Sequence, residues 1–157
     1  EAIRQAIDLS VDMIELDVRG SRDGVPVIIH NSTVDETTNG TGAVSSMDLS
    51  QLKKLDAGSW RDKQYAGERI PTLVEVLEYS RGKVNLSLDL KDESIVPAMI
   101  EAVQKANMID EVAICGCHEP QSQKIWEIDP NFTVLLNTDS QLDNLAKSED
   151  KSDFIRE

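Results

Sequence analysis

The sequence has 157 residues, a formal net charge of −13, 39% hydrophobic residues and 29% charged residues. This balance excludes a collagen-like or disordered chain, and no apolar run approaches the roughly 20 residues that span a bilayer. The excess of carboxylates argues against nucleic acid as a partner, because nucleic-acid-binding surfaces are basic.

The first residues already have the pattern of a helix, in which Ile3 and Ile7 share an apolar face. No signal-peptide pattern precedes them, and residues 152–157 resemble the first turn of a further helix. We therefore expect residues 1–157 to form a partial domain, cut from a longer protein at both ends. The sequence does not indicate a cellular compartment.

Apolar residues then alternate between a two-residue and a 3.6-residue period. The patterns predict strands at residues 13–18, 25–29, 84–90, 112–115 and 132–136. They predict helices at residues 48–55, 72–79, 94–107, 121–128 and 140–146, with Thr72 and Ser94 as caps of the second and third. Such alternation predicts an α/β fold with a parallel sheet and helices outside it. Residues 31–69 form a long irregular interruption, which indicates a functional segment.

Two acidic residues lie in the first predicted strand. Residues two apart in a strand face the same way, so Glu15 and Asp17 share one side while Leu16 faces the other. Neighbouring carboxylates repel each other and lose hydration, and a divalent cation between them removes both costs. The alternative is an edge strand with one side in water.

A second polar alternation lies in the third predicted strand, where Ser87, Asp89 and Lys91 share one side. Asp89 stands near the carboxyl end of this strand, which is where sites form in α/β folds. Three carboxylates from two strand ends favour a hard cation, Mg²⁺ or Ca²⁺. Lys91 either binds an anionic substrate or pairs with one of the acids.

The two histidines follow predicted strands. His30 ends the run Val27-Ile28-Ile29 and is a candidate general acid or base, because a histidine pKa lies near neutrality; a structural role is the alternative. His118 follows Cys115 and Cys117, but a zinc site would need a second ligand pair at a usual spacing. The two cysteines are therefore interpreted as small residues ending a buried strand.

In chain order, these segments resemble the glycerophosphodiester phosphodiesterase family, with the strong motifs confined to residues 1–91. The resemblance rests on Ile14-Glu15-Leu16-Asp17-Val18, Ser21-Arg22-Asp23-Gly24, Val27-Ile28-Ile29-His30, Thr37-Thr38-Asn39-Gly40-Thr41-Gly42, Leu55-Asp56-Ala57-Gly58, Ile70-Pro71-Thr72-Leu73-Val74-Glu75-Val76-Leu77 and Leu88-Asp89-Leu90-Lys91. It implies part of a (β/α)₈ TIM barrel, about strands 2–6 of 8, with a small insertion after the third strand at about residues 31–70.

The resemblance also implies roles for individual residues. Glu15, Asp17 and Asp89 correspond to metal ligands, His30 to one of two catalytic histidines, and Lys91 to a lysine that contacts the substrate phosphate. The other catalytic histidine and its neighbouring arginine have no counterpart in this chain.

The chain departs from the family pattern at four positions. Asn31 stands where an aspartate normally follows the histidine, and Glu36 replaces an arginine. Asp89 is one methylene shorter than the usual glutamate, and Ser10 stands at a usual glycine.

The implied activity is metal-dependent hydrolysis of small-molecule glycerophosphodiesters to glycerol phosphate and an alcohol by the intact protein, the fragment itself being weak or inactive. A phospholipase D-type sphingomyelinase activity and a non-catalytic binding or scaffold domain are the alternatives. Five strands of an eight-stranded barrel would leave two open edges, so we also expect the isolated chain to associate with a second copy or to be poorly stable.

Overall fold

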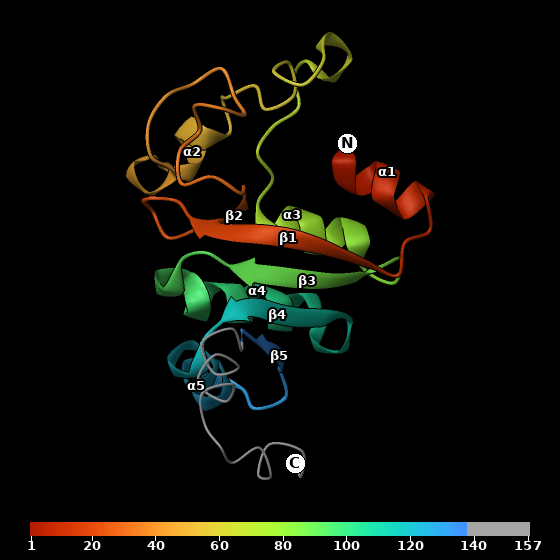
Figure 1. Cartoon of the computed structure of the whole chain (residues 1–157), viewed down its shortest axis with the longest axis vertical. Helices are drawn as coiled ribbons and strands as arrows, with labels where there is room; N and C mark the ends of the chain where they lie inside the picture. Colours follow the sequence, from red (N-terminus) through yellow and green to blue (C-terminus); the bar gives the residue numbers. More distant parts are fainter. Residues whose placement is uncertain (138–157) are drawn as a thin grey trace, which may run out of the picture.

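The computed structural model describes residues 1–137 and contains one five-stranded sheet in the order β2-β1-β3-β4-β5 (Figure 1). The strands are β1 (Met13–Gly20), β2 (Pro26–Ile28), β3 (Asn85–Leu90), β4 (Val112–Cys117) and β5 (Thr133–Leu136). The α-helices are α1 (Ala2–Asp8), α2 (Leu49–Leu52), α3 (Leu73–Ser80), α4 (Val96–Ala106) and α5 (Glu119–Ile128). Each strand predicted within residues 1–137 is confirmed. The helix predicted at residues 140–146 and the helical turn at residues 152–157 lie outside the described part.

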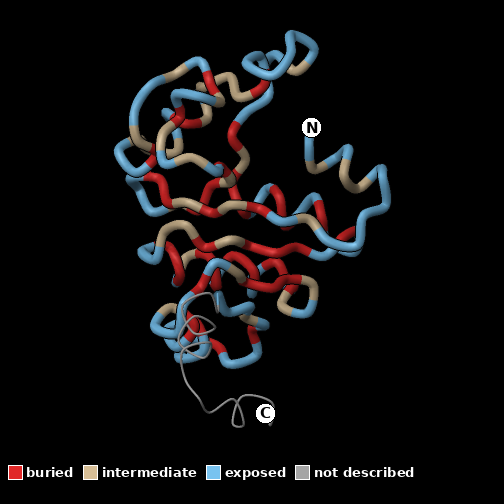
Figure 2. The backbone as a smooth tube through the Cα atoms, in the orientation of Figure 1, coloured by how far each residue is buried: buried red, intermediate tan, exposed pale blue. Residues whose placement is uncertain are grey.

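One face of the sheet packs against helices α3, α4 and α5. In Figure 1, α3 lies behind β1, α4 lies behind β3 and β4, and α5 lies below β4 near β5. The fully buried Val18, Leu86 and Leu88 pack in one cluster with Leu77 of α3 and Met99 of α4. In Figure 2, buried residues follow these strands and the helices that pack against them. Burial of each such side chain contributes about 1.5–3 kcal/mol, so this face fixes the strands and leaves their other face to polar residues.

Strand β2 corrects the expectation of an entirely parallel sheet. It pairs antiparallel with the end of β1, with Arg19 opposite Val27, whereas β1, β3, β4 and β5 are mutually parallel. The turn between β1 and β2 spans only residues 21–25, and a parallel connection needs a dozen or more residues. Gly24 has a φ of 77° there, so the Asp23-Gly24 pair was the sequence signal for a hairpin.

The predicted irregular segment from Asn31 to Arg69 is confirmed, apart from α2 and short 3₁₀ turns. A second cluster of buried side chains holds it against β2, and Val27, Val34, Val44 and Leu52 are its most buried members. Before β1, Ser10 has a φ of 57°, the left-handed conformation that favours glycine. This explains why the resemblance expects glycine at that position.

The two expected helix caps differ in the structure. The Thr72 hydroxyl accepts a hydrogen bond from the Glu75 backbone N–H, and the Glu75 carboxylate accepts one from the Thr72 N–H, which confirms the capping box of α3. The prediction for Ser94 is wrong, because a 3₁₀ turn precedes α4 and Asp92 accepts the Ser94 N–H at its start.

The variant Thr72→Ala is therefore expected to lower the free energy of unfolding of the full-length protein by about 1 kcal/mol, since it removes one partner of the capping box. Ser94→Ala is the matched control and is expected to stay within about 0.5 kcal/mol of the wild type. Urea unfolding followed by circular dichroism measures both. Equal losses for the two variants would contradict this assignment of the caps.

Strands β2 and β5 end the sheet within the described residues, and association of a second copy at these edges stays a prediction. In the same part of the chain, every helix is too short or too polar to cross a membrane.

Candidate functional site

The polar face of the sheet brings the predicted acidic residues together. In the parallel pairing of β1 with β3, Glu15 lies opposite Ser87 and Asp17 lies opposite Asp89. Because side chains alternate along a strand, these four residues share the face opposite the buried Leu16 and Leu88. The structure thus unites Glu15, Asp17 and Asp89, which are separated by up to 74 positions in the chain, on neighbouring strands.

Lys91 follows β3 and joins two of the carboxylates. Its Nζ lies 2.5 Å from Oδ2 of Asp89 and 3.2 Å from Oδ1 of Asp17. All three side chains are 18–27% exposed, so solvent screens these interactions only in part. The hydrogen bonds to Asp89 and Asp17 raise the pKa of Lys91, which keeps the ammonium group charged.

Within the described residues, Glu15 has no directly bonded cationic side chain that would neutralise its charge. Although Glu15 is exposed, partial loss of hydration and then the neighbouring charges of Asp17 and Asp89 raise its pKa, whereas Lys91 and His30 oppose this shift. The three carboxylates of Glu15, Asp17 and Asp89 and the Lys91 ammonium group together carry a formal charge of −2. A divalent cation balances that charge, so the donor set fits a metal ion.

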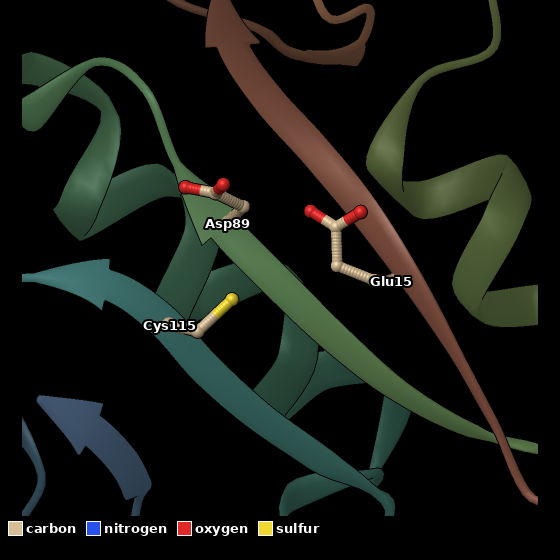
Figure 3. A group of neighbouring side chains, drawn as sticks. All are labelled: Glu15, Asp89 and Cys115. Atoms are coloured by element: carbon tan, nitrogen blue, oxygen red, sulfur yellow. The ribbon is translucent and has the colours of Figure 1, made fainter. Parts of the chain in front are cut away.

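A cysteine that sequence reasoning treated as structural lies within the same cluster. Donor atoms of Glu15, Asp89 and Cys115 all lie within 4.8 Å of one another, and Figure 3 shows the three side chains on one side of β1, β3 and β4. Cys115 is opposite Asp89 in the pairing of β3 with β4. Burial, followed by the charges of Asp89 and Glu15, raises the pKa of its thiol despite the hydrogen bond with Ser87.

Cys117 has the structural position predicted for it. It is fully buried in the main core, and burial raises the pKa of its thiol to about 11. His118 is exposed at the start of α5. Within residues 1–137, neither residue belongs to a group of three converging metal donors.

Gly116 allows the carboxylate of Asp89 to approach the backbone of β4 closely. Its φ is 71°, and a Cβ atom at this position would lie 2.1 Å from Oδ1 of Asp89. A side chain here would therefore push the carboxylate out of the cluster, in addition to the cost of the left-handed backbone. This glycine was missed in the sequence because its importance depends on the strand pairing.

Comparing substitutions at Gly116 and Gly82 is expected to separate the cost of the left-handed backbone from the displacement of the Asp89 carboxylate. Gly116→Ala and Gly82→Ala should each cost about 1–2 kcal/mol of stability, because both glycines have left-handed φ angles. At Gly82, however, no atom lies within 4 Å of the added Cβ. Only Gly116→Ala should weaken divalent-cation binding in titration calorimetry. An unchanged cation affinity in Gly116→Ala would contradict a role for Asp89 as a ligand.

His30 lies where β2 gives way to the irregular segment. The backbone N–H of Ile29 donates to the carbonyl of Asp17 (3.1 Å), and Nε of Arg19 donates to the carbonyl of His30 (2.8 Å). These two bonds place the histidine next to the end of the acidic strand.

A series of hydrogen bonds between side chains orients the imidazole of His30. Nδ2 of Asn31 donates to the carboxylate of Glu36 (2.8 Å), which directs Oδ1 of Asn31 toward Nδ1 of His30 (2.7 Å). An amide oxygen only accepts hydrogen bonds, so this contact requires a proton on Nδ1 and leaves Nε2 as the nitrogen that can exchange one. Asn31 and Glu36, two departures from the family pattern, thus act together to select one tautomer.

A cavity of about 1020 Å³ lies between α1, α3 and the irregular segment. Leu16, Ile28 and Trp60 are among its mainly apolar lining residues, and of the predicted site residues His30 alone borders it. The candidate site is therefore defined by its converging polar groups and not by this cavity.

Comparison with known proteins points to one family. The sequence profile of the glycerophosphoryl diester phosphodiesterase family matches residues 1–139. A glycerophosphodiester phosphodiesterase from Caldanaerobacter subterraneus is 37% identical over 141 residues, covering 86% of this chain and 58% of the relative. One from Bacillus subtilis is 31% identical over 157 residues and covers 88% and 54%, respectively.

Solved structures are similar over most of the described chain. The glycerophosphodiester phosphodiesterase of Agrobacterium tumefaciens has a TM-score of 0.76 and 35% identity, covering 92% of this chain and 60% of that protein. A phosphodiesterase from Oleispira antarctica, solved with the product sn-glycerol-3-phosphate, has a TM-score of 0.81 and 27% identity over 93% and 64% of the two chains.

The chain thus spans little more than half the length of these two curated relatives. The mostly parallel sheet with helices on one face is part of the family's (β/α)₈ TIM barrel, as expected. The profile match, the identity to named relatives and the shared fold lead to one conclusion: the chain belongs to the glycerophosphoryl diester phosphodiesterase family.

Proposed function

We propose that the full-length protein hydrolyses glycerophosphodiesters to glycerol phosphate and an alcohol, using a divalent cation. The observation that carries this proposal is the meeting of Glu15, Asp17, Asp89 and Lys91 on one face of the sheet. The product in the Oleispira antarctica structure supports the choice of substrate class.

In this proposal Glu15, Asp17 and Asp89 hold the cation, which is Mg²⁺ or Ca²⁺ if the oxygen donors dominate. A bound cation would neutralise phosphate oxygens and lower the pKa of the attacking hydroxyl or water. The carboxylates fix the position of that charge, and their crowding on β1 and β3 is what makes the ion favourable.

Lys91 and His30 supply the remaining chemistry of this chain. The Lys91 ammonium group lies among the acids and can shift toward a phosphate oxygen, where it would stabilise negative charge in the transition state. Nε2 of His30 would take a proton from the nucleophile or return one to the departing alcohol. As the new oxygen–phosphorus bond forms, the bond from phosphorus to the leaving oxygen breaks, and that oxygen takes up a proton.

The full-length protein should be assayed on glycerophosphocholine, with sphingomyelin as the parallel substrate. We expect glycerol phosphate and choline from the first and no choline from the second. Choline release from sphingomyelin alone would instead indicate the sphingomyelinase alternative. Turnover of neither, together with no calorimetric binding of a divalent cation, would indicate a scaffold domain.

A further inference from the structure

We propose that the thiolate of Cys115 is a third protein ligand beside Glu15 and Asp89, and that the cation site therefore prefers a borderline metal such as Zn²⁺ or Co²⁺ to Mg²⁺ or Ca²⁺. This inference rests on the proposed function, because it concerns the identity and ligands of the same ion. It keeps the activity and the cation site of the proposed function but replaces Asp17 with Cys115 in the set of ligands, and Asp17 then acts through Lys91.

The geometry of the three donors carries the inference. Donor atoms of Glu15, Asp89 and Cys115 come from three adjacent strands and lie within 4.8 Å of one another. A tetrahedral zinc ion contacts carboxylate oxygens at about 2.0–2.2 Å and a thiolate at about 2.3 Å, so neighbouring donors around it are roughly 3.5 Å apart. Donor atoms that all lie within 4.8 Å of one another therefore need only a small side-chain adjustment to share one ion.

Asp17 contacts Lys91 and does not point its carboxylate at the same place as Glu15, Asp89 and Cys115. Its carboxylate accepts a hydrogen bond from Lys91 and is not among the converging donors. Three protein ligands that leave one position for water or substrate are typical of catalytic zinc sites. In this arrangement, Asp17 acts by holding Lys91 beside the ion.

Two neighbours support the cysteine as a ligand. The buried Ser87 hydroxyl lies 3.2 Å from the sulfur of Cys115 and can donate to it, as outer-shell groups do for metal ligands. Gly116 lets Asp89 approach the same strand without a steric clash. A thiolate favours zinc and cobalt, whereas sites made of oxygen alone favour magnesium, calcium and manganese. Binding would release the thiol proton to solvent.

The test uses the full-length protein and the metal ions alone. Titration with Co²⁺ should produce a near-ultraviolet thiolate-to-cobalt charge-transfer band, which Cys115→Ser abolishes and Cys117→Ala retains. Cys117 is a matched control because it is the other cysteine of the chain and is buried away from the cluster. Calorimetry should show that Cys115→Ser lowers the preference for Zn²⁺ over Mg²⁺ at least about 10–100-fold, the loss that follows removal of an outer-shell partner.

X-ray absorption of the zinc-loaded wild-type protein needs no variant. It should show one sulfur at about 2.3 Å from the metal. Zinc surrounded by oxygen and nitrogen alone, or a charge-transfer band that survives in Cys115→Ser, would overturn the inference. If the protein then still binds Mg²⁺ and hydrolyses glycerophosphocholine, the proposed function stands without Cys115. If it binds no divalent cation, the proposed function fails as well.

Discussion

Replacement of His30 by asparagine is expected to lower kcat of the full-length protein on glycerophosphocholine about 10²–10⁴-fold, the usual contribution of one general acid or base. The asparagine amide can still reach Asn31, but it has no group that accepts and returns a proton in place of Nε2. His30 is exposed, so the free energy of unfolding should change by less than about 0.5 kcal/mol. Cation affinity should be unchanged, because the histidine is outside the group of converging donors.

His118 provides the matched control for this variant. It is the second of the two histidines in the chain and is also exposed, but it lies at the start of α5. His118→Asn should therefore leave kcat at the wild-type value. Steady-state kinetics at saturating cation measures both variants. Similar rates for His30→Asn and the wild type would remove His30 from the mechanism.

The variant Asp89→Asn is expected to weaken divalent-cation binding by at least about 10–100-fold, since it removes a direct ligand and not merely an outer-shell partner. The change preserves the size of the side chain but removes the charge that faces Lys91 and Glu15. Activity should fall with it and recover in part as the cation concentration is raised. Calorimetry and turnover against cation concentration measure the two effects separately.

Asp110→Asn is the control for the loss of one acidic charge. Asp110 is exposed in the turn before β4, and its removal should alter neither binding nor turnover. The proposed role of Asp89 would be untenable if both variants bound the cation as tightly as the wild type.

The sequence predicted on which side of its own strand each site residue lies. It did not predict which residues lie next to it on the adjacent strands. Alternation in β1 and β3 correctly placed Glu15 and Asp17 on one side and Asp89 on one side of its own strand. The meeting of Cys115 with Asp89 depends on the pairing of β3 with β4, which alternation within a single strand does not specify. The convergence of the carboxylates came from the family resemblance and from the rule that sites form at strand ends.

The departures at Asn31 and Glu36 illustrate the same limit. Considered separately, Asn31 and Glu36 each remove a charged side chain that the family pattern places near the catalytic histidine. In the structure they are hydrogen-bonded to each other, and Asn31 also contacts His30. Residues five positions apart in an irregular segment have no periodicity that predicts such a contact, so only the folded chain shows that the two changes act together.

The most direct test of the central claim is hydrolysis of glycerophosphocholine by the full-length protein after removal of metal with a chelator. The crowding of Glu15, Asp17 and Asp89 predicts that activity is lost and that it returns when a divalent cation is added back. The account would be contradicted if the chelated protein, shown by elemental analysis to be free of metal, turned over substrate at the original rate.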